Sequence, residues 1–392
     1  MSGPGPEDPL GGIPFLGELA KLLQGQTAGG WEAARQLAVQ IAGAGTAEPN
    51  PDPLDRMAFE ELGRVAELHV GNATGLTIAH SGRPLTVVPV TRAEWARRTV
   101  DAWRPLLEKL SASLTGPALA GGLVDDLDDD PQAAMLRPLL QMLGPVMLGL
   151  QAGSMVGHLA SVSLGQYDLP IPRPPSDELV VVARNLHELG EEWSLPRDDL
   201  RLWICLSEVA THAVIGVPHV RERLWALLDR HVSSFALDTS AIEEALGSID
   251  PTDPEALQAA LGDPAALLGS IQSEAQKTLL PELSALVAVV VGYVDHVMDT
   301  IGGSLIGSYG MLTEALHRRR VEAAAADRFV EHLLGLALGR EQYERGEAFV
   351  RGVLERDGDI GALFTSATAL PTPNEVDAPG LWLARLELPD DR

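Results

Sequence analysis

The stretch that decides the fold is LWICLSEVATHAVIGVPHVRERL, residues 202–224. Its apolar residues recur every three or four positions, which predicts a helix from about Asp198 to Ile215 with most of its surface buried. Gly216 and Pro218 then break the helix, and a second helix follows. The sequence therefore places a buried helix, ending in a sharp turn, at the centre of the molecule.

One face of this helix combines apolar and ionisable side chains. Ile204, Glu208 and His212 are spaced by four residues and share that face. A buried carboxylate needs a partner, and two ligands one helical turn apart are the spacing that a zinc site uses. The alternative is an internal Glu–His hydrogen bond or a contact that caps the turn at Gly216. His219, after the turn, is a candidate cleft residue or a cap for the next helix.

A second apolar helix is predicted for LSALVAVVVGYVDHVMDTIGG, residues 283–303. Its apolar run is too short to span a bilayer, so we expect a core helix. Asp295 and Asp299 share one face with His296 beside them, and their alternative partners are the arginines of the run Arg318–Arg320. If the two helices meet, carboxylates and imidazoles suited to zinc come together. The expected metal ligands are Glu208, His212, Asp295, His296 and Asp299.

The rest of the chain predicts a mainly α-helical protein with a few short strands. We expect a Gly/Pro-rich N-terminal segment over residues 1–50 with short helices at Phe15–Leu23 and Trp31–Ala42, and a single helical domain over 51–392. Pro84–Val90 and Leu179–Val182 have the pattern of short strands. Further helices are expected at Leu54–His69, Thr91–Leu114, within the apolar region Met135–Val162, Val220–Phe235, Thr239–Leu246, Pro254–Leu261, Ser273–Ile301, Ser308–Ala325, Asp327–Leu338 and Glu341–Glu355.

The composition excludes several classes of partner. The 55 acidic and 29 basic side chains give a formal net charge of −26, which opposes binding to nucleic acid and to anionic lipid surfaces. A single cysteine, Cys205, excludes an internal disulfide framework. The opening MSGPGPEDPL lacks the basic region of a signal peptide, so we expect a cytoplasmic protein without membrane contact. The sequence sets no oligomeric state.

A proline-rich loop, GQYDLPIPRPPS at Gly165–Ser176, offers two further candidate residues. Tyr167 and Asp168 are polar groups that could line a cleft and contact a peptide or small-molecule ligand. The alternative for Asp168 is a local turn in which its carboxylate bonds to the backbone.

Several segments resemble the zincin-like metallopeptidase type 2 family, known from actinobacterial hydrolases of unassigned substrate. Some relatives are associated with biosynthesis of a deazaflavin coenzyme. The resemblance runs in order along nearly the whole chain. The matching segments are DPLGGIPFLGEL, ELGRVAELHVGNATGL, QMLGPVMLGLQAGSMVGHLA, GQYDLPIP, both helices above, EALHRRR, LLGLALGREQYERGEAFV and LPTPNEVDAPGLWLARL.

The resemblance implies zinc as cofactor, but the motif is incomplete. Zincin members of the family carry HExxH, in which two histidines hold zinc and the glutamate activates a water molecule. Here residues 208–212 read EVATH. His212 matches the second histidine, Glu208 stands at the first, and Val209 replaces the general base. On the second helix Val291 stands where relatives often have glutamate.

Two functions follow from this pattern. As a family member, the chain is a zinc-dependent hydrolase with weak or absent proteolysis, because Val209 cannot accept a proton from water. Glu208 is then the remaining candidate catalytic residue. Alternatively, the chain is a non-catalytic binding or scaffolding protein that uses the former active-site cleft.

Overall fold

The computed structural model describes residues 29–43, 48–79, 81–120, 149–235, 273–321, 325–336 and 338–388. Within these residues helices dominate and strands are confined to one pair, which confirms the predicted mainly α class. The elements are α2 (Gly29–Ala42), α3 (Pro53–Thr74), β1 (Thr86–Val90), α4 (Arg92–Ala120), a helix over 149–162, β2 (Glu178–Val182), α6 (Ala183–Glu192), α7 (Arg197–Gly216), α8 (Pro218–Ser233), α12 (Glu274–Leu305), α13 (Tyr309–Val321), α14 (Ala325–Leu333), α15 (Arg340–Leu354), the 3₁₀ turns η1 (Ile360–Phe364) and η2 (Ala367–Ala369), α16 (Pro373–Asp377) and α17 (Pro379–Glu387).

The sequence patterns locate most of these elements. The helix expected at Trp31–Ala42 is α2, and the two expected strands are β1 and β2. Some expected helices lie outside the described residues, namely Phe15–Leu23, Thr239–Leu246 and Pro254–Leu261. The apolar region Met135–Val162 is described only from residue 149 onward. α2 packs against α4. The division of the chain at residue 50 stays a prediction.

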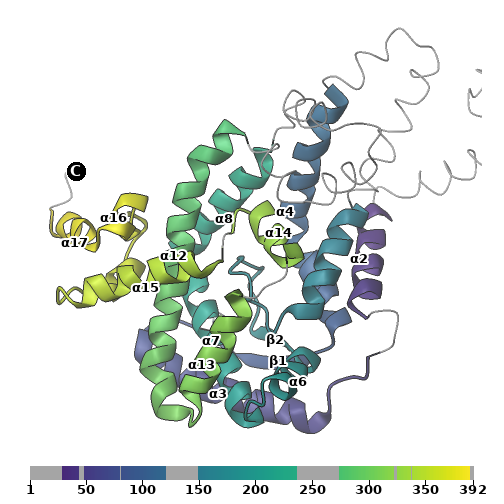
Figure 1. Cartoon of the computed structure of the whole chain (residues 1–392), viewed down its shortest axis with the longest axis horizontal. Coiled ribbons are helices and arrows are strands. Elements are labelled where there is room, and N and C mark those ends of the chain that lie inside the picture. Colours follow the sequence, from purple (N-terminus) through teal and green to yellow (C-terminus); the bar gives the residue numbers. More distant parts are fainter. Residues whose placement is uncertain are drawn as a thin grey trace, which may run out of the picture.

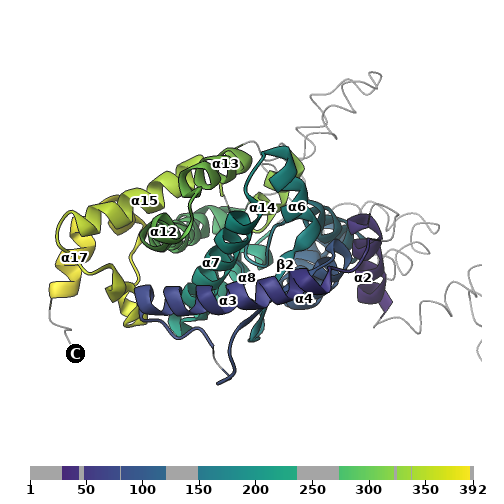
Figure 2. The ribbon, with the colours of Figure 1, turned by 90° about the horizontal axis from the view of Figure 1, so that it is seen from below.

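Helices α7 and α12 form the centre of the molecule. In Figure 2, α3 lies along one side and α13 and α15 along the other, with α7 and α12 between them. Nearly every residue of α7 from Leu200 to Ile215 is buried, which explains its apolar composition. Pro at the first position of α8 turns the chain sharply, and the axes of α7 and α8 meet at 87°. This turn is where the sequence predicted a break.

α12 is the long core helix. A capping box of Ser273 and Gln276 starts it. It packs closely against α15, because a Cβ at Gly292 would overlap the backbone of Gly346 and a Cβ at Gly346 would overlap that of Ala288. These glycines allow the two backbones to touch.

α12 is also the one helix in the described part of the chain that is long and apolar enough to cross a membrane by itself. The bent pair α7–α8 passes the same test only when counted as one span. However, 67% of the most apolar stretch of α12 is buried by other elements. Its hydrophobic surface is therefore used in packing, as in the core helix that the sequence predicted.

The two strands fix the position of the loop that follows residue 162. β1 and β2 pair in parallel, from Thr86 opposite Glu178 to Val90 opposite Val182. On the other edge of β2, Gly165 forms an antiparallel bridge with Val181, and Leu164 accepts a hydrogen bond from the Val182 amide at 2.8 Å. This pairing holds the loop against the strand pair, which lies next to α7 in Figure 1.

Candidate functional site

The carboxylate of Glu208 lies at the contact between α7 and the loop over residues 164–168. It is only 2% exposed. Its Oε2 accepts hydrogen bonds from the backbone amides of Gln166 at 2.9 Å and Tyr167 at 3.0 Å, and Oε1 accepts from Tyr167 at 3.1 Å. A Cβ at Gly165 would overlap this carboxylate, so only glycine allows the loop to come so close. Glu208 thus joins the loop to the core helix.

This environment changes the ionisation of Glu208. Burial, with a further contribution from the charge of Asp168, raises its pKa to about 8, against the opposing effect of the two backbone amides and of Arg173. At neutral pH the side chain is therefore mostly the neutral acid.

His212 lies one turn further along α7 and contacts the same loop. Its Nδ1 is 3.1 Å from the hydroxyl of Tyr167. Burial raises the pKa of Tyr167 to about 12, so the phenol stays protonated and is able to donate to this nitrogen. Glu208 and His212 therefore share Tyr167 as a partner residue.

A buried arginine supports the loop from the other side. The guanidinium of Arg173 lies over the rings of Trp95 and Trp103, at 5.6 and 5.4 Å from their centroids. It donates to the carbonyl of Gln166 at 3.2 Å and to the hydroxyl of Thr99 at 3.0 Å. Burial lowers the pKa of Arg173 to about 10, which leaves it charged at neutral pH. The indole of Trp95 also donates to the carbonyl of Gly165 at 2.8 Å.

Sequence reasoning did not single out Arg173, although a signal was present. Trp95 and Trp103 are eight residues apart and lie on one face of a helix. Arg173 is the one basic residue in the proline-rich loop. An aromatic pair on a helix and a lone arginine in an apolar loop are typical of a cation–π contact, but nothing in the sequence pairs them.

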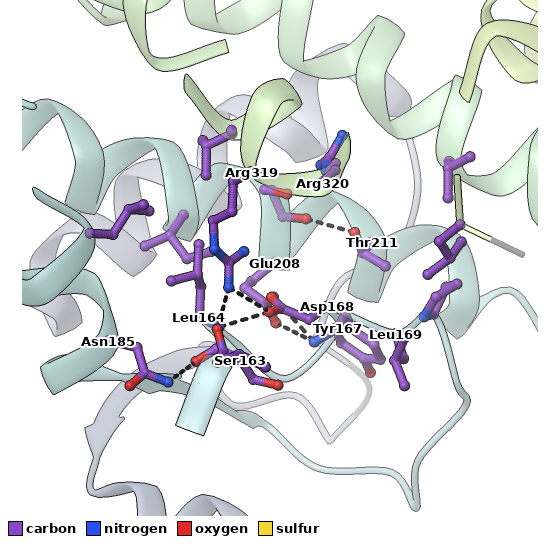
Figure 3. A pocket seen from close by; sticks show the side chains of 18 of the residues that line it. Ser163, Leu164, Tyr167, Asp168, Leu169, Asn185, Glu208, Thr211, Arg319 and Arg320 are labelled. Atoms are coloured by element: carbon purple, nitrogen blue, oxygen red, sulfur yellow. Dashed lines mark hydrogen bonds and ion pairs between the residues drawn. The ribbon is translucent and has the colours of Figure 1, made fainter. Parts of the chain in front are cut away.

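A cavity of about 440 Å³ opens beside this site. Figure 3 shows Arg319 and Arg320 on one side of it and Tyr167, Asp168 and Glu208 on the other. The carboxylate of Asp168 accepts hydrogen bonds from the amides of Leu164 at 2.8 Å and Gly165 at 3.3 Å, as in the predicted turn. Other lining residues include Asn185, Trp193, Trp203, Ile204, Thr211, Val291, Val294, Asp295, Leu316, Leu338 and Tyr343.

The five expected metal ligands do not form one site. Asp295 lines the cavity and has Arg320 as its ion-pair partner, with Oδ1 and Nη1 3.9 Å apart. Asp299 accepts a hydrogen bond from the Tyr309 hydroxyl at 2.7 Å, and the ring of His296 packs near that of Tyr293. In the described part of the chain no three His, Cys, Asp or Glu side chains lie close enough to hold an ion.

Each of the two carboxylates on α12 has a partner of its own. The arginine alternative raised for Asp295 is the contact that the structure shows, whereas Asp299 bonds to a tyrosine. His219 lies away from the cavity, where its Nε2 is 3.1 Å from the carbonyl of Leu363 in η1. Val209 is fully buried in the core.

Comparison with known proteins agrees with the resemblance seen in the sequence. A solved structure from Chloroflexus aurantiacus, described as a "putative hydrolase with a novel fold", aligns with a TM-score of 0.58 at 20% identity, over 92% of this chain and 99% of that one. At this identity the likeness shows the fold alone. No curated protein matches the chain. The family described as zincin-like metallopeptidase matches residues 30–383. Since this match spans most of the sequence, the chain belongs to the zincin-like metallopeptidase family.

Proposed function

We propose that this chain keeps the fold of its family but does not hydrolyse peptides through zinc, and that it binds a small ligand in the cavity beside Glu208. The observation that carries the proposal is the environment of the Glu208 carboxylate. Both of its oxygens accept hydrogen bonds from backbone amides of the loop, at the position where the family motif has its first zinc-binding histidine.

The residues present do not fit a zinc ion. A catalytic zinc site uses three protein ligands and leaves one position for water. Here His212 is the only imidazole next to Glu208 on α7, and both oxygens of Glu208 already accept hydrogen bonds from the loop. The described residues offer no group of three donors around them.

The motif also lacks a group for proton transfer. Val209, at the position of the general base, is an aliphatic side chain inside the core. Glu208 borders the cavity, but its hydrogen bonds to Gln166 and Tyr167 fasten the loop. A general base must be within hydrogen-bond reach of the water that it activates. These features support binding rather than hydrolysis.

The cavity supports the second half of the proposal. Its volume is within the range of small-molecule sites, and its wall combines apolar side chains with six acidic and two basic ones. Family membership alone supports a hydrolase, as does the description of the Chloroflexus protein. Hydrolysis and ligand binding can be distinguished by experiment, because only a zinc hydrolase needs His212 for metal binding and for peptide cleavage.

The test is a peptidase assay on protein purified without a histidine tag. Casein and a mixed fluorogenic peptide library are incubated with wild type and with His212→Ala, each with zinc or with EDTA. We expect equal, background rates in all four samples, with thermal melts showing that both proteins are folded. Cleavage by the wild type that EDTA stops and that His212→Ala lacks would establish hydrolysis and overturn the proposal.

A further inference from the structure

Among the described residues, eight charged side chains line the cavity, six of them acidic, and the four that pair with one another form what we call the charged quartet. Arg319 and Arg320 extend from the end of α13, Asp168 comes from the loop, and Asp295 comes from α12. Nη2 of Arg319 is 3.9 Å from Oδ2 of Asp168, and Nη1 of Arg320 is 3.9 Å from Oδ1 of Asp295. Burial lowers the pKa of Arg320, but the charges of Tyr343, Asp295 and Asp168 raise it above its usual value, so both aspartates lie near its guanidinium.

The quartet faces the cavity rather than the outer surface. Both Asp295 and Arg320 line the cavity, and 38% of the Asp295 side chain and 30% of the Arg320 side chain are accessible. This accessible surface is available to a ligand in the cavity. Figure 3 shows Arg319 reaching across toward Asp168 and Glu208.

The two ion pairs of the quartet are loose. For comparison, Arg345 donates two hydrogen bonds to Asp377 outside the cavity, at 2.7 and 3.1 Å. In the quartet each pair is separated by 3.9 Å, and no hydrogen bond joins Arg320 to Asp295. Arg319 donates to the carbonyl of Val162, and Arg320 lies over the ring of Tyr343 at 4.3 Å. A guanidinium has five N–H donors, so both arginines retain donors for a ligand.

The wall next to the quartet is apolar. Trp203 and Ile204 contribute from α7, and Val291 and Val294 from α12. A ligand that fits here has both signs of charge at one end and an apolar group at the other. An anion alone would leave Asp295 without a closer partner, and a cation alone would leave Arg320 without a closer acceptor.

We propose that the charged quartet binds a free α-amino acid with an apolar side chain. The ligand carboxylate lies against Arg319 and Arg320, its ammonium lies against Asp295 and Asp168, and its side chain contacts the wall formed by α7 and α12. Each loose pair is then replaced by two closer charge-assisted contacts. This inference rests on the proposed function, because it takes the cavity as a binding site rather than a catalytic one.

The test is titration calorimetry with L-leucine and two half-ligands, in buffer containing EDTA. 4-Methylpentanoate lacks the ammonium and 3-methylbutylamine lacks the carboxylate. We expect one leucine to bind per chain, and each half-ligand to bind about tenfold or more weakly. An amine that binds as tightly as leucine would overturn the proposal in favour of a plain cation site, and so would an absence of heat for leucine.

Three variants assign the contacts. Asp295→Asn should weaken leucine and the amine by about tenfold and leave 4-methylpentanoate unchanged, and Arg320→Gln should do the reverse. Asp377→Asn, which alters an ion pair outside the cavity, should change neither. Equal effects of the first two variants on all three ligands would contradict the proposed orientation.

The two proposals fail in different ways. Peptide cleavage that depends on zinc and on His212 would refute the non-hydrolytic function, whether or not leucine binds. A protein that neither cleaves peptides nor binds leucine would refute only the choice of ligand.

Discussion

The carboxylates of α7 and α12 are chemically alike but have different surroundings. Glu208 on α7 is buried, mostly neutral at neutral pH, and held by backbone amides of a distant loop. Asp295 and Asp299 on α12 are partly accessible and have side-chain partners, Arg320 and Tyr309. The comparison teaches that Glu208 stabilises the fold by bonding to the loop, whereas Asp295 keeps accessible surface that a ligand can contact. The predictions below test this difference, from the largest expected effect to the smallest.

The largest effect is expected for Glu208→Ala. It leaves the amides of Gln166 and Tyr167 without their acceptor and creates a cavity, so we expect a loss of about 3–5 kcal/mol in the free energy of unfolding. Urea denaturation measures it. The matched control is Glu282→Ala, which removes an exposed ion pair with Arg223 and should cost less than about 1 kcal/mol. Equal losses for the two variants would show that the hydrogen bonds between Glu208 and the loop do not stabilise the fold.

The second prediction concerns pH. The pKa of Glu208 is raised from 4.5 to about 8, so between these values the folded protein binds more protons at this group than the unfolded chain does. Its contribution to stability is complete below about pH 4.5 and is lost as the pH rises to 8, by up to about 1.4 kcal/mol per pH unit. Glu208→Gln cannot titrate.

Urea unfolding of wild type and Glu208→Gln at pH 5, 6.5 and 8 measures this loss. The advantage of the wild type over the glutamine variant should shrink as the pH rises. A difference that stays constant, or that grows with pH, would mean that Glu208 is ionised in the folded protein.

A smaller effect is expected at Gly165. Its substitution by alanine places a Cβ against the Glu208 carboxylate and forces the loop to move, so we expect a loss of about 2–3 kcal/mol. Gly303→Ala on α12 is the control, because its added Cβ meets no atom within 4 Å and alanine favours a helix. That variant should be neutral or slightly more stable in the same denaturation assay. A neutral Gly165→Ala would show that the loop is free to shift.

The smallest effects separate the two tyrosines. Tyr167→Phe removes a buried hydroxyl that contacts His212, and should cost about 1 kcal/mol. Tyr309→Phe removes a more exposed hydroxyl that donates to Asp299, and should cost about 0.5 kcal/mol or less. Thermal melts of the two variants provide the comparison. A larger loss of stability for Tyr309→Phe than for Tyr167→Phe would contradict the claim that the contacts of α7 are the more strongly structural ones.

Much of the fold was predictable because it depends on local patterns. The 3.6-residue period and the break at Gly216 and Pro218 located α7 and α8, and the β-branched runs located both strands. The placement of Glu208 and His212 on a buried face also followed from spacing alone.

The partners of those residues were not predictable. Glu208 bonds to backbone amides about 40 positions earlier in the chain, and backbone donors have no signature in the sequence. The expected meeting of Asp295, His296 and Asp299 with α7 required the relative rotation of two helices, which apolar periodicity does not define. Asp295 faces the cavity, whereas Asp299 lies a turn further along at an exposed position.

The central claim is that Glu208 is a neutral structural acid and not a metal ligand. The most direct measurement is carbon-13 NMR of protein labelled at the glutamate carboxyl carbon, with Glu208 identified by subtracting the spectrum of Glu208→Gln. We predict a titration midpoint near pH 8 that one equivalent of zinc does not change. A midpoint below pH 5, or a signal that shifts when zinc is added, would contradict the claim.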